Sequence, residues 1–172
     1  MQTQNRADGG ARKALVGSVA SVNVSPGGVP KRPIPSGWVN RLGLEADGHT
    51  EPVPIHGGVE QAISIYSTES IARVVADGHQ AFAGAFGENL TLEGIELGEL
   101  GEGDHLRIGS GGLELQLTAR AEPCQTIAHW FVERRIARIG SKQYPEDTRW
   151  YARVLTEGPM TTGDRVEVVP GG

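Results

Sequence analysis

The sequence contains a single cysteine among its 172 residues, and this scarcity excludes several kinds of fold and site. One cysteine can form no intrachain disulfide and can build no cysteine-rich zinc site. The five histidines follow no HExxH spacing, and the chain has no GxSxG elbow, no Walker loop and no GxGxxG after a strand. The sequence therefore gives no support to a disulfide scaffold, a zinc protease, a serine hydrolase or a nucleotide-binding fold.

Net positive charge and long apolar runs are also lacking. Sixteen basic against 21 acidic residues give a formal charge of −5, whereas nucleic-acid proteins need basic surface, so we expect no nucleic-acid partner. No run approaches the roughly 20 apolar residues that a membrane span requires, and residues 1–13 contain no apolar signal region. We expect a cytoplasmic protein with no membrane contact, whose residues 1–13 form a loose tail.

Glycine and proline are abundant, with 25 and 10 residues, which is typical of many turns between short strands. The length suits one compact domain, predicted over residues 14–170. Alternating or β-branched residues predict strands at 16–24, 61–66 and 90–92, and a hairpin of two strands turning at 110–112. Two further segments, 149–158 and 164–169, look like a closing pair. We expect a mainly β fold with a few helices.

Two helices are expected. Ser67 is a plausible N-cap for the first, in which Ile71, Val74 and Val75 are spaced as on one helical face, and Gly78 is a natural stop. The second is predicted to follow Cys124, with an apolar stripe and three arginines toward its end. Segments 25–37 and 43–60 read as loops.

Gly-Asp followed by alternating apolar residues occurs twice, at 102–108 and at 162–168. A Gly-Asp turn that leads into a strand explains both without any function, and two occurrences do not make a repeat array. The similarity fits a closed or half-closed sheet in which similar corners recur.

Cys124 is the first candidate for chemistry. A thiol near a helix N-terminus has a lowered pKa, which favours the thiolate that binds metals or attacks electrophiles. A buried structural role is the commoner fate of a lone cysteine. A nucleophilic pair with His56 or His129 is conceivable, although His129 lies five residues along the predicted helix.

Three further motifs are weaker. His56-Gly57-Gly58 could present backbone amides to an anion, but a tight turn explains it equally simply. Residues 84–91, GAFGENLT, include Glu88 and Asn89, which could hydrogen-bond a heterocycle or merely satisfy turn backbone. Lys31 and Arg32 could contact a phosphate, although solvated loop charges are more frequent.

Taken in order, these blocks resemble the MOSC family, named after the C-terminal domain of molybdenum-cofactor sulfurases, and especially its small stand-alone bacterial members. The blocks are GLEADGH, HGGVEQAISIY, GAFGENLTLEGIELGELGEGDHLRIG, EPC, WYARVLTEG and TTGD, within residues 31–168. Each block is weak alone, but the ordered set is specific. The resemblance implies a MOSC-type β-barrel.

The resemblance also implies a site for the molybdenum cofactor (molybdopterin), with Cys124 as catalytic residue and metal ligand. Oxidoreductase relatives act on N-hydroxylated or related small molecules and receive electrons from a separate redox partner. The alternative is a sulfur carrier that takes sulfur from a donor as a Cys124 persulfide, and a third possibility is a domain that keeps the fold without either activity. The positions expected to hold the cofactor are Lys31, His56, Gly57, Gly58, Gly87, Glu88, Asn89, Leu90, Thr91 and Arg120.

One position departs from the family pattern. Many cofactor-binding relatives have an arginine three residues before the cysteine, where this chain has Ala121. Arg120 is adjacent, but along a strand it would point to the opposite face. The departure puts one anionic contact, or cofactor binding itself, in question.

Overall fold

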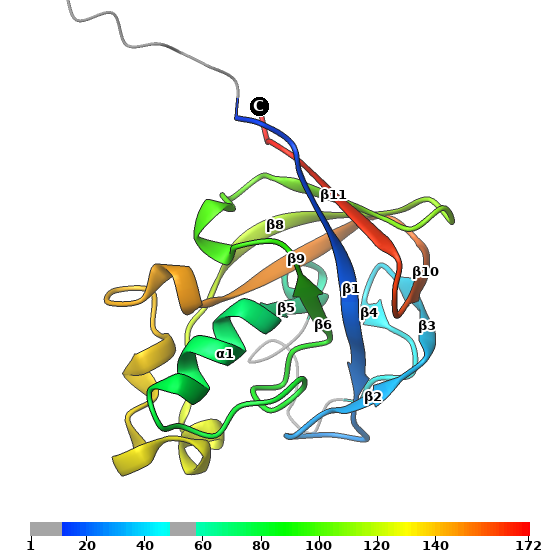
Figure 1. Ribbon diagram of the computed structural model, residues 1–172. Helices are drawn as coiled ribbons and strands as arrows, with labels where there is room; N and C mark the ends of the chain where they lie inside the picture. The colour runs from blue at the N-terminus through cyan, green and yellow to red at the C-terminus, as the bar shows by residue number, and fades with distance from the viewer. Residues whose placement is uncertain (1–11, 49–57) are drawn as a thin grey trace, which may run out of the picture.

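A computed structural model describes residues 12–48 and 58–172 of the chain. Within these residues, one sheet with the order β11-β7-β8-β9-β5-β6-β1-β2 closes on itself because β11 also pairs with β1, which makes a barrel of seven strands (Figure 1). Its strands are β1 Leu15–Val24, β2 Arg32–Ile34, β5 Ile63–Ser67, β6 Leu90–Glu93, β7 His105–Ile108, β8 Leu113–Ala121, β9 Arg149–Thr156 and β11 Arg165–Val169. The expected mainly β barrel is confirmed.

Alternation along the strands fills the barrel. In β8 the side chains of Leu113, Leu115 and Leu117 are buried, and the residues between them are partly exposed. The neighbouring β7 and β11 contribute buried residues with the same period of two, as the sequence predicts. The hairpin that joins β7 to β8 turns at residues 109–112, as expected.

The two Gly-Asp segments form the same turn. Asp104 accepts a hydrogen bond from the backbone N–H of Gly101 (2.8 Å), and Asp164 accepts one from Thr161 (2.9 Å). Gly103 and Gly163, which precede the two aspartates, have φ of 88° and 93°, a region that favours glycine. The turns lead into β7 and β11, which are antiparallel neighbours, so recurring corners of a closed sheet explain the similarity.

Three expectations about the remaining strands need correction. The closing segments are strands, but β9 pairs with β8 and β5, whereas β11 pairs with β7 and β1. The loop predicted at 25–37 contains β2 and the start of β3 Ser36–Asn40, and the loop predicted at 43–60 contains β4 Gly43–Leu44. Strands β3 and β4 form a second, three-stranded sheet with β10 Gly158–Thr161. Strand β2 escaped prediction because of its proline, which is tolerated there since β2 lies at a sheet edge.

The one α-helix of the described residues, α1 Thr68–Ala76, begins and ends as predicted. The side chain of Ser67 accepts a hydrogen bond from the N–H of Ser70 (3.2 Å), and Gly78 follows the helix with φ of 92°. Val74 is fully buried and Ile71 packs against the core, but Val75 is 48% exposed. The apolar face of the helix is therefore narrower than the sequence suggests.

The second predicted helix is wrong in type. Cys124 is followed by three short 3₁₀ turns: η3 Gln125–Trp130, η4 Val132–Arg134 and η5 Ile136–Ile139. Glu133 and Arg134 have φ of 53° and 56°, so the backbone cannot continue as a right-handed helix. Of the side chains that suggested a helical stripe, Trp130 and Phe131 pack on Phe82 and Phe86 in the segment before β6, and Ile127 is buried in the core.

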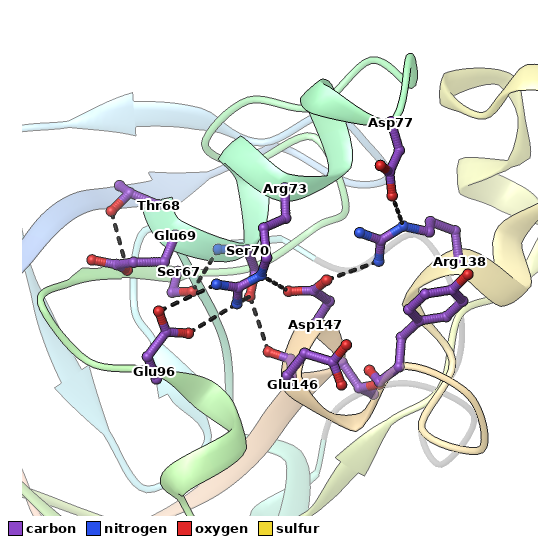
Figure 2. A network of polar contacts seen from close by, with 12 residues as sticks. Ser67, Thr68, Glu69, Ser70, Arg73, Asp77, Glu96, Arg138, Glu146 and Asp147 are labelled. Atoms are coloured by element: carbon purple, nitrogen blue, oxygen red, sulfur yellow. Dashed lines mark hydrogen bonds and ion pairs between the residues drawn. The ribbon is translucent and has the colours of Figure 1, made fainter.

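A buried carboxylate fastens this 3₁₀ segment to α1 (Figure 2). Asp147, in η6 Pro145–Asp147, accepts a hydrogen bond from Nε of Arg73 on α1 and from Arg138 on η5, both at 2.8 Å. Arg138 also donates to Asp77 (2.7 Å) and lies over the Tyr144 ring. The network fixes the layer of short turns that lies beside α1 outside the barrel.

The described residues contain no helix that is both long and apolar enough to cross a membrane. Most of the predicted tail, residues 1–13, lies outside the described residues. Arg12 does not behave as part of a loose tail, because its guanidinium pairs with the buried Asp104 (2.5 Å). The domain limits of 14–170 stay a prediction.

Candidate functional site

Cys124 lies between the end of β8 and the start of η3. Its backbone is extended, its side chain is half-buried, and its Sγ lies 2.7 Å from the hydroxyl oxygen of Thr126. The thiol is not part of the hydrophobic core, so a purely structural role in packing is not supported. The segment that follows is a 3₁₀ helix of six residues, so Cys124 does not stand at the N-terminus of an α-helix as the sequence predicted.

Lys31 and the GENLT segment, residues 87–91, come together as predicted. The backbone N–H of Lys31 donates to the carbonyl of Gly84 (2.9 Å), and its ammonium forms an ion pair with Asp47. The side-chain amide of Asn89 donates to the same carboxylate (2.8 Å) and accepts from the N–H of Ser64 (3.2 Å). These groups therefore satisfy one another and are not free donors.

Glu88 and Thr91 belong to the same buried network. Glu88 is fully buried; its Oε1 accepts from the N–H of Gly84 (2.7 Å) and from the Thr91 hydroxyl (3.3 Å). The side-chain amide of Asn23 in turn donates to the Thr91 oxygen (3.0 Å). Burial raises the pKa of the Glu88 carboxyl, and its Oε2 has no hydrogen-bond partner.

The other sequence candidates have local structural roles. Leu90 is fully buried in the core, and Gly87, with φ of 84°, offers its carbonyl to the Ser64 hydroxyl (3.0 Å). Gly58 has φ of 83° and precedes η1 Val59–Gln61. His56 and Gly57 lie outside the described residues.

Arg120 and Ala121 face opposite sides of β8, as expected. Arg120 stands opposite Trp150, its guanidinium carbon 3.9 Å above that ring, and donates to the carbonyl of Thr148 (3.1 Å). Burial lowers the pKa of Arg120. Ala121 stands opposite Arg149, the first residue of β9. Arg120 is thus held by the Trp150 ring and the Thr148 carbonyl.

Arg149 is a candidate that sequence reasoning missed. Its side chain is buried, and it donates to the carbonyl of Phe86, in the segment that precedes GENLT (2.6 Å). The Phe86 ring stacks on Phe131, in the segment that follows Cys124 (centroids 5.2 Å apart). Arg149 therefore lies where the end of β8, the GENLT segment and the Cys124 segment meet.

Tyr66, on β5, completes this buried polar group. Its ring packs edge-on against Phe86 (5.5 Å), and its hydroxyl is buried without a partner. Burial raises the pKa of this hydroxyl, and the nearby Asp147 and Glu88 carboxylates raise it further. Tyr66, Glu88 and Arg149 each leave one polar atom unsatisfied, which indicates unused hydrogen-bonding capacity beside the site.

Asn23, Asp47 and Ser64 were also missed. A buried polar residue within an apolar strand was the available signal for Asn23 and Ser64, and Asp47 stands inside the GLEADGH block. Their partners are distant in sequence: Asn23 and Thr91 are 68 residues apart. Such pairs depend on tertiary structure and leave no local pattern.

A separate cleft of about 600 Å³ lies where α1 meets the 3₁₀ turns. Its lining includes His79, Arg134, Arg135 and Tyr144, but not Cys124. Arg138, which also lines it, is already paired with Asp77 and Asp147. The cleft is therefore distinct from the site around the thiol.

The donor set can be tested against the cofactor that the resemblance implies. Among the described residues, no three His, Cys, Asp or Glu side chains cluster as a metal site. A cofactor that brings most of its own metal ligands needs only one from the protein, and a partly exposed thiolate suits molybdenum. The buried guanidinium of Arg149, whose Nε has no partner, suits an anionic group. Cys124 and Arg149 thus fit, whereas the side chains of Lys31, Asn89 and Thr91 are already engaged.

Comparison with curated proteins finds two small bacterial relatives. The chain is 29% identical to the uncharacterized protein YflK of Bacillus subtilis over 84% of its own length, and 29% identical to protein YiiM of Escherichia coli over 76%. It spans 64% and 58% of the length of these relatives, so both are longer.

Solved structures share the fold. YuaD from Bacillus subtilis superposes with a TM-score of 0.74 at 16% identity, covering 91% of this chain and 97% of that one. YiiM from Geobacillus stearothermophilus gives 0.66 at 24% identity, covering 90% and 75%. The family model for the MOSC domain matches residues 52–167, more than half of the sequence, and the chain belongs to the MOSC domain family.

Proposed function

We propose that the protein binds the molybdenum cofactor through Cys124 and is the oxidoreductase component that acts on N-hydroxylated or related small molecules. The observation that supports this most is the state of the thiol: it is half-buried, outside the core, and touches the Thr126 hydroxyl. The MOSC family, to which the chain belongs, is associated with molybdenum-cofactor binding or sulfurase-like function.

Each part of the site has a distinct task in this proposal. The Cys124 thiolate is the protein ligand to the metal, and a hydrogen bond from Thr126 fixes its orientation. The network of Lys31, Asp47 and Asn89 holds the GENLT segment in place. When bound, the cofactor supplies the redox-active metal centre. A separate redox partner protein delivers electrons.

The second candidate function is sulfur transfer, and the same accessible thiol supports it. The Cys124 thiolate would attack the terminal sulfur of a donor persulfide, forming an S–S bond at Cys124 as the donor leaves as a thiolate. The Thr126 hydroxyl, at 2.7 Å, can donate a hydrogen bond to the attacking thiolate. An acceptor thiolate would then take the terminal sulfur and regenerate Cys124.

Molybdenum and released pterin separate the two functions. Wild type and Cys124→Ser are purified from a host that makes the cofactor, and their folding is checked by circular dichroism. We expect both components in wild type and neither in the variant, with Thr118→Ser, an exposed-strand hydroxyl variant, behaving as wild type. A folded wild type without molybdenum or pterin contradicts the cofactor proposal. Transfer from a persulfide donor, seen as the mass of one added sulfur at Cys124, would then support the carrier.

A further inference from the structure

Arg149 stands at the place that the family pattern assigns to another residue. It is directly opposite Ala121 in the β8–β9 ladder. Directly opposite residues of an antiparallel pair have their side chains on the same face, a few ångströms apart. An arginine on β9 therefore projects from the same face of the sheet as position 121, next to which β8 ends and the chain turns toward Cys124.

The guanidinium of Arg149 forms no ion pair among the described residues. Only 6% of the residue is exposed; one terminal nitrogen donates to the Phe86 carbonyl at 2.6 Å, and Nε has no partner. No carboxylate oxygen of residues 12–48 and 58–172 lies within ion-pair distance of it. A guanidinium has five N–H donors, and burying it unpaired is costly.

The other buried arginine of the structure shows the contrast. Arg138 has two carboxylate partners, Asp77 and Asp147, at 2.7 and 2.8 Å. The Glu88 carboxyl is fully buried and interacts electrostatically with Arg149, but it lies beyond ion-pair distance. Arg149 therefore lacks the close carboxylate partners that Arg138 has.

Packing through Phe86 connects Arg149 to the segment that follows Cys124. Its hydrogen-bond partner Phe86 stacks on Phe131, which belongs to the segment that begins at Cys124. The Cys124 carbonyl accepts a hydrogen bond from the N–H of Ile127, whose side chain is buried in the core. The start of this segment is therefore held as well as Phe131. A ligand that reaches Cys124 along the end of β8 meets the face from which Arg149 projects.

We propose that Arg149 is the cationic contact of the Cys124 site and binds the phosphate or another oxyanion of the ligand held there, in place of an arginine at position 121. The inference rests on the proposed function for the identity of the ligand. The positive charge would neutralise an anion that otherwise enters a partly buried site, and its planar fork suits two parallel hydrogen bonds to oxygen.

The first test needs no cofactor. Cys124 is the only cysteine, so its alkylation rates with anionic iodoacetate and neutral iodoacetamide can be compared in the cofactor-free protein. We expect the ratio of the two rates to fall at least threefold in Arg149→Ala, and inorganic phosphate to reduce the wild-type ratio. Arg153→Gln is the matched control: it lies on the same face of β9, but is partly exposed and bonded to Glu60. An unchanged ratio in Arg149→Ala would overturn the inference.

The second test moves the arginine across the strand pair. In protein from a cofactor-producing host, Arg149→Ala should lower bound molybdenum and pterin about tenfold or more, the scale of a lost charged hydrogen bond. The double variant A121R/R149A should recover most of that loss. If Arg149→Ala is folded and fully loaded, or the folded double variant is no better than the single one, the inference is wrong while the proposed function stands.

The outcomes distinguish a failure of the proposed cofactor function from a failure of the role assigned to Arg149. A wild type that is empty of molybdenum and pterin contradicts the proposed function, and the alkylation ratio still decides whether Arg149 acts on Cys124. If Arg149→Ala does not fold, Arg149→Lys replaces it in both tests. Lysine keeps the positive charge but cannot form the two parallel hydrogen bonds of a guanidinium. This variant should then keep the alkylation ratio and lose cofactor; a lowered ratio with full cofactor would overturn the inference.

Discussion

Asp147 is expected to be a principal determinant of the stability of the 3₁₀ layer, and Asp147→Asn tests this. The carboxylate is 1% exposed and accepts from Arg73 and Arg138 at 2.8 Å each (Figure 2). Asparagine has the same shape but no charge, and its NH₂ group would face one of the arginines. The variant therefore leaves a buried cation, Arg138, with only the half-exposed Asp77.

The burial of Asp147 sets the expected loss in free energy of unfolding. Removing one partner of a buried ion pair costs about 3–5 kcal/mol, and because Arg73 is 38% exposed we expect the lower end, about 3 kcal/mol. For a chain of this size that corresponds to a melting temperature lower by roughly 6–12 °C. Urea unfolding followed by circular dichroism measures the free energy, with the slope checked for two-state behaviour.

A control at the surface end of the network sharpens the test. Glu96 pairs with Arg73 at 2.9 Å but is 45% exposed, so Glu96→Gln should cost about 1 kcal/mol or less. If Asp147→Asn is no more destabilising than Glu96→Gln, the Asp147 carboxylate is not a principal determinant of stability. That result would mean that apolar packing alone holds the 3₁₀ segment against α1.

Further predictions concern pH and turn geometry. Burial raises the pKa of Glu88 above its ordinary value of 4.5, so the folded state holds this proton more tightly; its contribution to stability is full below about pH 4.5 and is lost as pH rises through the folded pKa. Glu88→Gln should therefore gain stability relative to wild type between about pH 5 and pH 8 in urea titrations; a constant difference would contradict this. Gly103→Ala and Gly163→Ala should each cost about 1–2 kcal/mol, because both glycines have positive φ and an added Cβ meets nothing within 4 Å. Markedly unequal costs would contradict the equivalence of the two turns.

The strands were predictable because their signals are local. The alternation of Leu113, Leu115 and Leu117 specifies a strand with one buried face, and Ser67 and Gly78 mark both ends of α1. The order of short motifs along the chain was enough to indicate the family, now shown by the match over residues 52–167.

The rest depends on contacts between distant parts of the chain. The 3₁₀ turns after Cys124 require the left-handed backbone of Glu133 and Arg134, which tertiary packing imposes against their local preference. Arg149 became a candidate only through the register that sets it opposite Ala121. In the GENLT segment, sequence identified the residues but could not show that Asn89 and Thr91 bond to the protein itself.

The most direct measurement of the central claim is X-ray absorption at the molybdenum edge with selenocysteine in place of Cys124. Because the chain has one cysteine, selenium would enter at a single position. We predict that the cofactor-loaded selenocysteine protein has selenium in the first coordination shell of molybdenum. The cofactor-loaded wild type should have sulfur and no selenium there. Bound molybdenum without a selenium neighbour would contradict the assignment of Cys124 as the metal ligand.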